Sequence, residues 1–274
     1  MTAPLSASKT ASKTVSMTAQ PAIPRRTWWT MFTRLFAIQG SWNYELLMGT
    51  GIAFCVEPAL KELPGGTDGP AYREALARQA RYFNAHPYLA SLAVGALARV
   101  ELDRVNGSTI ERFRTALCGP LGSVGDRLVW AGWLPLCSLL ALAAFGAGAR
   151  AWLVIALFLV IYNLGHVALR VWGLREGWSR GHRVAGALGG PVFRQGPEHI
   201  ARAGALLAGI ALPAALARVI GPGRDMEGMI YGILLVTALG SVTLARLHGR
   251  VEGWRASMVV LAAFVLYAVA QHHG

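Results

Sequence analysis

Long apolar stretches fill the second half of the chain. Residues 128–149 form a run of 22 positions without a formal charge, and residues 151–169 form a run of 19. A helix that crosses a bilayer needs about 17–25 apolar residues, so both runs predict membrane spans. Residues 229–245 and 256–270 predict two further spans, and residues 203–217 predict a shorter, broken element that contains Pro213.

The first half of the chain is apolar but repeatedly interrupted by polar residues. Residues 27–63 carry polar groups and glycines at intervals too short for a simple span. Residues 71–83 predict an amphipathic helix, and residues 84–87 break it. Residues 88–98 are apolar but too short to cross a bilayer, which favours a half-helix or a re-entrant hairpin. Segments of this kind occur where their polar groups face protein or a cavity.

These patterns divide the chain into a tail and a membrane domain. Residues 1–24 hold few large apolar residues and no continuous apolar core of a signal peptide, which predicts a disordered cytoplasmic tail. Residues 25–274 form the membrane domain, with interfacial and re-entrant segments at 25–127 and the main transmembrane helices at 128–274. A Gly- and Arg-rich connector at 173–196 lies at the level of the lipid headgroups. We therefore expect an all-α membrane protein, and discontinuous segments on both sides of a connector are compatible with an inverted-repeat transporter.

Composition and charge support a membrane location. The chain is 54% hydrophobic and 15% charged, with a formal net charge of +12. Soluble domains carry about 25% charged residues. Arginines mark the edges of the apolar runs, as in short cytoplasmic loops beside lipid headgroups, and this pattern disfavours nucleic-acid binding. Three cysteines have no partners at zinc-ligand spacing and fit a buried, unpaired role.

A polar block at residues 39–45 is the first candidate site. Its side chains include Gln39, Ser41, Trp42, Asn43 and Glu45. Amides, hydroxyls and carboxylates bind sugar hydroxyls, and an aromatic ring stacks on the C–H face of a sugar. The same block also fits a polar helix cap at the membrane interface with an aromatic anchor, and the sequence leaves both interpretations open.

Two further blocks carry candidate residues. Asn84 and His86 lie in a predicted turn, where Asn84 also fits a helix cap, Pro87 fits the first helical position and His86 fits a ligand or a structural residue. Asp126 follows a Gly-rich segment and precedes the first long apolar run. It fits a functional carboxylate at the mouth of the membrane or the N-cap of a span. No metal site, cofactor motif or catalytic nucleophile set is visible in the sequence.

Four blocks in order carry a family resemblance. Residues 39–45 (QGSWNYE), 83–88 (FNAHPY), 101–107 (ELDRVNG) and 119–126 (GPLGSVGD), followed by Trp130, resemble the IID component of mannose/fructose/sorbose phosphotransferase systems. The pairs Tyr162-Asn163, Trp172-Gly173 and Gly177-Trp178 continue the match. Where the family usually has Ala-Gly, this chain has Gly122-Ser123.

The resemblance implies a role that the composition does not. It implies a non-enzymatic membrane subunit that pairs with a IIC subunit, assembles as a trimer of heterodimers, and moves a hexose of the mannose class inward. Separate IIA and IIB components are expected to phosphorylate the sugar, and the location is expected to be the bacterial cytoplasmic membrane. In this scheme the block at 39–45 faces the sugar path or the IIC partner, and Asn84, His86 and Asp126 support it.

Two alternatives remain open at this point. An orphan subunit of this type would serve as a non-transporting binding, sensing or scaffolding protein, and complexes of this family also act as receptors for some bacteriocins. Genes for the other components beside this one would favour transport. A membrane enzyme that acts on lipid-linked substrates through Asp126 and His86 would depend on a metal or yield a lipid product.

Overall fold

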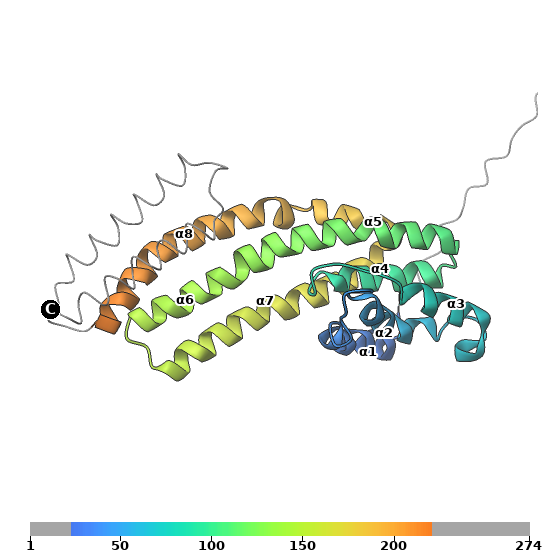
Figure 1. The fold of residues 1–274 in the computed structure, drawn as a ribbon, viewed down its shortest axis with the longest axis horizontal. Helices are drawn as coiled ribbons and strands as arrows, with labels where there is room; N and C mark the ends of the chain where they lie inside the picture. The colour runs from blue at the N-terminus through green and yellow to red at the C-terminus, as the bar shows by residue number, and fades with distance from the viewer. Residues whose placement is uncertain (1–22, 221–274) are drawn as a thin grey trace, which may run out of the picture. The chain divides into compact units, whose positions relative to one another are not determined.

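The computed structural model describes residues 23–220, and the regular elements in that range are all helices (Figure 1). The all-α fold class is therefore confirmed. Among the described residues, 23–137 together with Leu159–Ala203 form one compact unit, and Ser138–Phe158 together with 204–220 form the second. The elements in order are α1 (Arg25–Arg34), η1 (Leu35–Ala37), α2 (Gly49–Leu60), η2 (Gly66–Asp68), α3 (Pro70–Gln79), α4 (Ala90–Leu102), α5 (Gly107–Gly125), η3 (Asp126–Trp133), α6 (Leu134–Gly146), α7 (Ala151–Arg180), η4 (Gly181–Gly189) and α8 (Pro191–Ile220).

Two helical stretches of the described part are long and apolar enough to cross a membrane. They are Gly107–Gly146 and Ala151–Val219, and they contain the runs predicted at 128–149, 151–169 and 203–217 apart from the few residues at the turn after Gly146. The helix does not begin near residue 128, as the boundary at 127 predicted, but at Gly107. Asn106 caps it, because its side-chain oxygen accepts a hydrogen bond from the Ser108 N–H at 3.0 Å.

The connector predicted at 173–196 is also more helical than its composition suggested. α7 continues to Arg180, η4 follows as a 3-10 segment, and α8 begins at Pro191. The predicted spans at 229–245 and 256–270 lie outside the described residues, as does nearly all of the predicted N-terminal tail. An inverted repeat, which would involve those spans, stays a prediction.

The long helix changes character in its middle. α5 gives way at Asp126 to the π-helical segment η3, which ends at Trp133 before α6 begins. Pro135, near the start of α6, has no N–H to donate to the carbonyl four residues earlier, so the regular α-helical ladder is interrupted there. Short π segments inside α-helices occur often at functional sites, and η3 places Asp126 and Trp130 beside the segment that precedes α4.

α4 is the central helix of the first unit. Every residue from Ala90 to Glu101 is buried, and α2, α5 and η4 pack around it. A helix that is apolar on all sides is a core helix or a membrane span. At 13 residues, or about 20 Å by the helical rise, α4 is too short to span a bilayer by itself. The apolar run at 88–98 therefore belongs mainly to a helix buried among other helices.

Three glycines let α4 and α7 approach closely. A Cβ atom at Gly177 would lie 2.1 Å from the Leu92 carbonyl oxygen, and one at Gly95 would lie 2.4 Å from the Leu174 carbonyl oxygen. A Cβ atom at Gly173 would lie 2.1 Å from the Ser91 hydroxyl oxygen. Small residues spaced four apart, as at 173 and 177, commonly allow such contacts between membrane helices. Backbone touches backbone here, so no side chain can be added without moving a helix.

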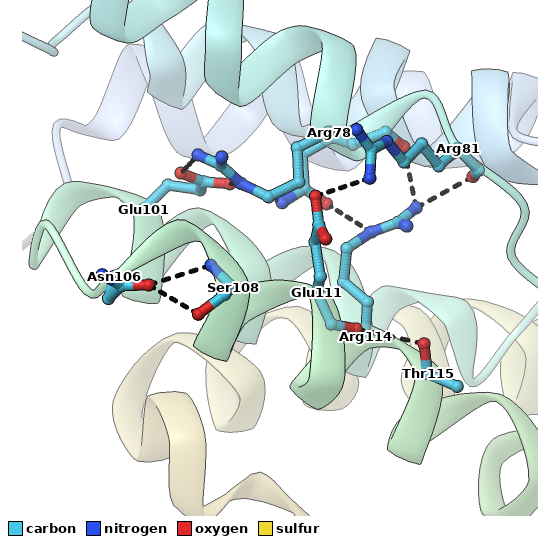
Figure 2. A network of polar contacts seen from close by, with 9 residues as sticks. Arg78, Arg81, Glu101, Asn106, Ser108, Glu111, Arg114 and Thr115 are labelled. Carbon is cyan, nitrogen blue, oxygen red and sulfur yellow. Dashed lines mark hydrogen bonds and ion pairs between the residues drawn. The ribbon is translucent and has the colours of Figure 1, made fainter.

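A buried polar network joins α3, α4 and α5 (Figure 2). Glu101 is buried, and its carboxylate accepts hydrogen bonds from Arg78 at 2.8 and 2.9 Å and from Gln79 at 2.7 Å. Arg114 donates in turn to the Gln79 side-chain oxygen at 2.9 Å and to the Arg81 carbonyl oxygen at 3.0 Å. Each buried charge therefore has hydrogen-bond partners, as burial requires. The Glu101 of the acidic sequence block has a structural role in this network.

Glu57 links the first three helices. Its carboxylate pairs with Arg34 of α1 at 2.7 Å and with Lys61 at 2.9 Å, and it accepts a hydrogen bond from the Tyr72 hydroxyl of α3 at 3.1 Å. Burial alone would raise the pKa of Glu57, but the hydrogen bonds from Lys61, Arg34 and Tyr72 together lower the pKa below its usual value.

In the second unit, Arg218 caps the end of α6. Its guanidinium donates to the carbonyl oxygens of Phe145 and Ala149, the latter at 2.9 Å, and its cationic centre lies 4.4 Å from the centre of the Phe145 ring. A cation at a helix C-terminus satisfies carbonyl groups that have no partner within the helix.

Replacing Gly177 with alanine should destabilise the protein by about 1–3 kcal/mol, because the new methyl group overlaps the α4 backbone. Thermal unfolding in detergent measures the change. Gly119→Ala is the matched control, since nothing lies within 4 Å of a Cβ atom at this helical glycine. The control should be neutral or stabilising by up to about 1 kcal/mol. Equal unfolding temperatures for the two variants would contradict the close approach.

Glu57→Gln should lower the unfolding free energy at pH 7 by about 1–3 kcal/mol, since it removes a charged acceptor of three donors. The pKa of Glu57 is lower in the folded state, so its stabilisation is present above the unfolded value of about 4.3 and is lost as pH falls through the folded pKa. Denaturant titrations at pH 7 and pH 3 should therefore show a gap between wild type and variant that narrows in acid. A gap that widens in acid would contradict this assignment.

Candidate functional site

A turn at residues 39–48 forms the first wall of the site. The Asn43 side-chain oxygen accepts hydrogen bonds from the Glu45 and Leu46 N–H groups at 3.0 and 2.8 Å, which closes the turn. The Met48 N–H donates to the Phe83 carbonyl oxygen at 3.0 Å, and the Phe83 N–H donates to the Leu46 carbonyl oxygen at 3.2 Å. These bonds hold the first and second polar sequence blocks side by side.

The polar block at residues 119–126, at the end of α5, lies against His86 of the second candidate block. The His86 N–H donates to the Leu121 carbonyl oxygen of α5 at 3.3 Å. A Cβ atom at Gly125 would lie 2.2 Å from the His86 Cβ atom, so only glycine allows this approach. Gly125, the last glycine before Asp126, therefore brings the end of α5 against the His86 segment.

The three blocks enclose a cavity of about 210 Å³. Five of the predicted site residues line it, namely Gln39, Trp42, Asn84, His86 and Asp126. The predicted residues Ser41, Asn43 and Glu45 do not line it: all three are exposed in the turn, where Asn43 holds the backbone. The cavity has further lining residues outside the predicted set: Met48, Ala85, Pro87, Gly122 and Trp130.

His86 supplies a hydrogen-bond donor to this cavity. It is buried, and its Nδ1 accepts a hydrogen bond from the Tyr88 N–H at 3.2 Å, so the neutral ring carries its proton on Nε2. That Nε2 atom is buried and has no partner among the described residues. Burial, with a smaller contribution from the positive charge of Arg170, lowers the pKa of His86 to about 4. His86 is therefore a neutral donor at physiological pH, held in one orientation.

Asp126 supplies an acceptor and does not cap a helix. Its backbone is helical, with φ of −62° and ψ of −43°, and the helix runs through it without a break. The N-cap alternative is wrong because an N-cap residue requires a helix to begin there. Pro87 and Asn84 likewise do not begin a helix, since α4 starts at Ala90 with no side-chain cap. Asp126 and Asn84 are both exposed at the cavity.

α7 contacts the site through Tyr88, which follows His86 by two residues. The Tyr88 hydroxyl lies 2.6 Å from the Tyr162 hydroxyl, and the His166 ring stacks on the Tyr88 ring with centres 4.2 Å apart. Arg170 donates to His166 Nε2 at 2.7 Å and to the Leu35 carbonyl oxygen. Its guanidinium also lies 5.2 Å from the centres of the Phe36 and Tyr88 rings. Arg170 thus joins η1, the His86 segment and α7.

Little in the sequence indicated that Tyr162, His166 and Arg170 of α7 would contact the candidate site. Arg170 stands at the edge of the apolar run at 151–169, where an arginine is usual at a membrane boundary, but the structure buries it. Among residues 23–220, no group of three or more histidine, cysteine, aspartate or glutamate side chains is arranged to hold a metal ion. The arrangement offers hydrogen bonds and aromatic faces to a small neutral polar ligand.

Comparison with known families decides the identity. The model of the PTS system mannose/fructose/sorbose family IID component matches residues 22–210. The chain belongs to this family. The resemblance inferred from the four blocks is thus confirmed, and the chain is an IID membrane component of the mannose-family phosphotransferase systems.

Individual relatives agree with this family. The mannose-specific EIID component of Escherichia coli K12 is 31% identical over 174 residues, which are 60% of this chain and 59% of that protein. The fructose permease IID component of Bacillus subtilis is 30% identical over 64% of each chain. The sorbose-specific EIID component of Klebsiella pneumoniae is 31% identical over 66% of each chain. The matches therefore span about three fifths to two thirds of these relatives.

Solved structures share the fold. A chain of the mannose transporter ManYZ, solved by cryo-electron microscopy in complex with microcin E492, superposes with a TM-score of 0.55 at 20% identity, over 92% of this chain and 98% of that one. A second structure, described only as a membrane protein, gives a TM-score of 0.67 at 21% identity, over 92% and 97%.

Arg170→Gln should destabilise the protein by about 1–3 kcal/mol, because the Leu35 carbonyl and the His166 ring lose a charged donor in a buried place. Thermal unfolding in detergent, followed by tryptophan fluorescence, reports the loss. Arg175→Gln is the control, since Arg175 lies on the same helix but is exposed. An equal response of the two variants would contradict the supporting role of Arg170.

Proposed function

We propose that this IID component, together with a IIC partner, carries a hexose of the mannose class into the cell for phosphorylation by separate IIA and IIB components. The observation that supports this proposal is the cavity at the meeting of the three sequence blocks. It combines a buried neutral donor on His86, the Asp126 carboxylate, two amides and two tryptophan rings. Hydroxyl groups and the C–H face of a sugar require this combination.

Each lining residue has a proposed part. The amides of Gln39 and Asn84 and the carboxylate of Asp126 bind hydroxyl groups, and His86 donates to a sugar oxygen. Trp42 or Trp130 stacks on the ring. Ser41 and Glu45 lie exposed on the turn that Asn43 closes, so we assign this turn to the contact with the IIC partner.

The proposed partner and location are those that membership of the family suggests. The related mannose transporter ManYZ supports a paired membrane assembly, for which we propose a trimer of heterodimers in the bacterial cytoplasmic membrane, with the N-terminal tail on the cytoplasmic side. Large apolar side chains of α7, including Trp152 and Leu164, are 64% and 66% exposed. Such side chains require lipid or another subunit to cover them.

Asp126→Asn and Asn84→Ala should each reduce hexose uptake by about 10- to 100-fold, the loss that one hydrogen bond to a charged or buried partner produces. The measurement is uptake of labelled mannose by cells that lack their own mannose system and carry this chain with its IIC, IIA and IIB partners. Asp68→Asn is the matched control, since Asp68 lies in η2 and does not line the cavity.

Membrane levels of each variant, measured by immunoblot, separate loss of transport from loss of protein. If both cavity variants were present at wild-type levels and retained full uptake, the assignment of the site would be wrong. If wild-type cells with all partners took up no hexose, the chain would fit the non-transporting binding subunit instead.

A further inference from the structure

A second cavity lies along one face of α7, away from the polar site. Its volume is about 500 Å³, and α7 contributes residues at positions 165, 168, 169, 172, 176 and 180. These positions recur at helical spacing, so they form one stripe. At a rise of 1.5 Å per residue the stripe is about 22 Å long. The other walls come from η3, η4 and the start of α8, with Leu128, Trp133, Ala187, Val192, Phe193 and Ile200 among them. We call this cavity the α7 groove.

The α7 groove is apolar at one end and charged at the other. Near Gly165 the wall is the Trp133 ring, whose indole N–H donates to the Tyr162 carbonyl oxygen at 3.5 Å. Farther along, Trp172 packs against Phe193 with ring centres 5.0 Å apart. The stripe ends at Glu176 and Arg180, which form an ion pair four residues apart. A molecule that fits this groove must have a long apolar part and one polar end.

The charged end holds an ion pair, and two further arginines stand near its lining residues in the sequence. Glu176 and Arg180 line the α7 groove. Arg183 in η4 follows Arg180 by three residues, and Arg194 in α8 is next to the lining residue Phe193. Arg180, Arg183 and Arg194 are exposed. Arginine clusters beside a membrane span attract anionic lipids, by about 1 kcal/mol for each residue near the surface.

We propose that the α7 groove binds one acyl chain of an anionic phospholipid, with the lipid phosphate at Arg180. The apolar part of the stripe accepts the acyl chain, and the arginines beside its polar end accept the headgroup. One leaflet of a bilayer is about 15 Å of hydrocarbon, so a groove of about 22 Å accommodates a chain together with the start of its headgroup. A partner helix would not need a charged end, and a sugar would not match the apolar walls.

Native mass spectrometry tests this binding on the full chain, purified in detergent with whatever subunits remain bound. The probes are phosphatidylglycerol and phosphatidylcholine with identical acyl chains. We expect the wild type to prefer phosphatidylglycerol by about tenfold, which corresponds to about 1.4 kcal/mol. Arg180→Gln should reduce that preference by about fivefold, and Ala168→Phe, which fills the groove, should reduce binding of both lipids.

Each variant has a matched control. Arg202→Gln also removes the arginine of an exposed ion pair four residues apart, with Glu198, but neither residue lines the α7 groove. Val167→Phe adds the same ring at the exposed position next to Ala168, outside the groove. Both controls should bind lipid as the wild type does, and circular dichroism shows whether each variant is folded.

Three outcomes would overturn the proposal. They are equal binding of the two lipids by the wild type, equal effects of Ala168→Phe and Val167→Phe, and loss of a co-purifying subunit from Ala168→Phe while lipid binding is unchanged. The last result would make the α7 groove a protein interface. None of these readouts depends on transport, so their failure leaves the proposed sugar site untouched.

Discussion

The contact of α4 with α7 through glycine is the constraint on which the rest of the first unit depends. Gly95 and Gly177 bring the two backbones into direct contact, and Gly173 packs against the Ser91 hydroxyl. α4 then lies buried inside the unit, and the segment that leads into it is held against α7. Tyr88 therefore reaches Tyr162 and His166, and Arg170 reaches the carbonyl oxygen of Leu35. A larger distance between α4 and α7 would break the contacts of Tyr88 with Tyr162 and His166.

In the first unit, charged side chains between the helices form hydrogen bonds and ion pairs with one another. The network of Arg78, Glu101, Gln79 and Arg114 (Figure 2) and the ion pairs of Glu57 both join helices that are close in sequence. An unpaired charge in an apolar environment costs several kcal/mol or more. His86 Nε2 is different, because it is buried, unpartnered and at a cavity. For this reason the proposed sugar site assigns a ligand oxygen to this atom.

Two solved membrane-protein structures share this fold. In the described part of the chain, the two long helical stretches are long and apolar enough to cross a membrane, while α1 to α4 lie together beside the site (Figure 1). The proposed sugar site lies where the two kinds of element meet, at η3. The α7 groove offers different chemistry, since its walls are apolar and one end holds the Glu176–Arg180 ion pair.

The sequence alone determined the helical class, the membrane character and the three blocks from which the site is built. It could do so because hydrophobic period, charge and residue type are local properties. The tertiary structure decided which residues of each block face the cavity: it selected Gln39, Trp42 and Asp126 and turned Ser41 and Glu45 away. It also decided that Arg170 is buried and that the apolar run at 88–98 leads into and forms most of the buried helix α4. These outcomes depend on which distant segments touch, and the glycines that permit those contacts look, in one sequence, like any other glycine.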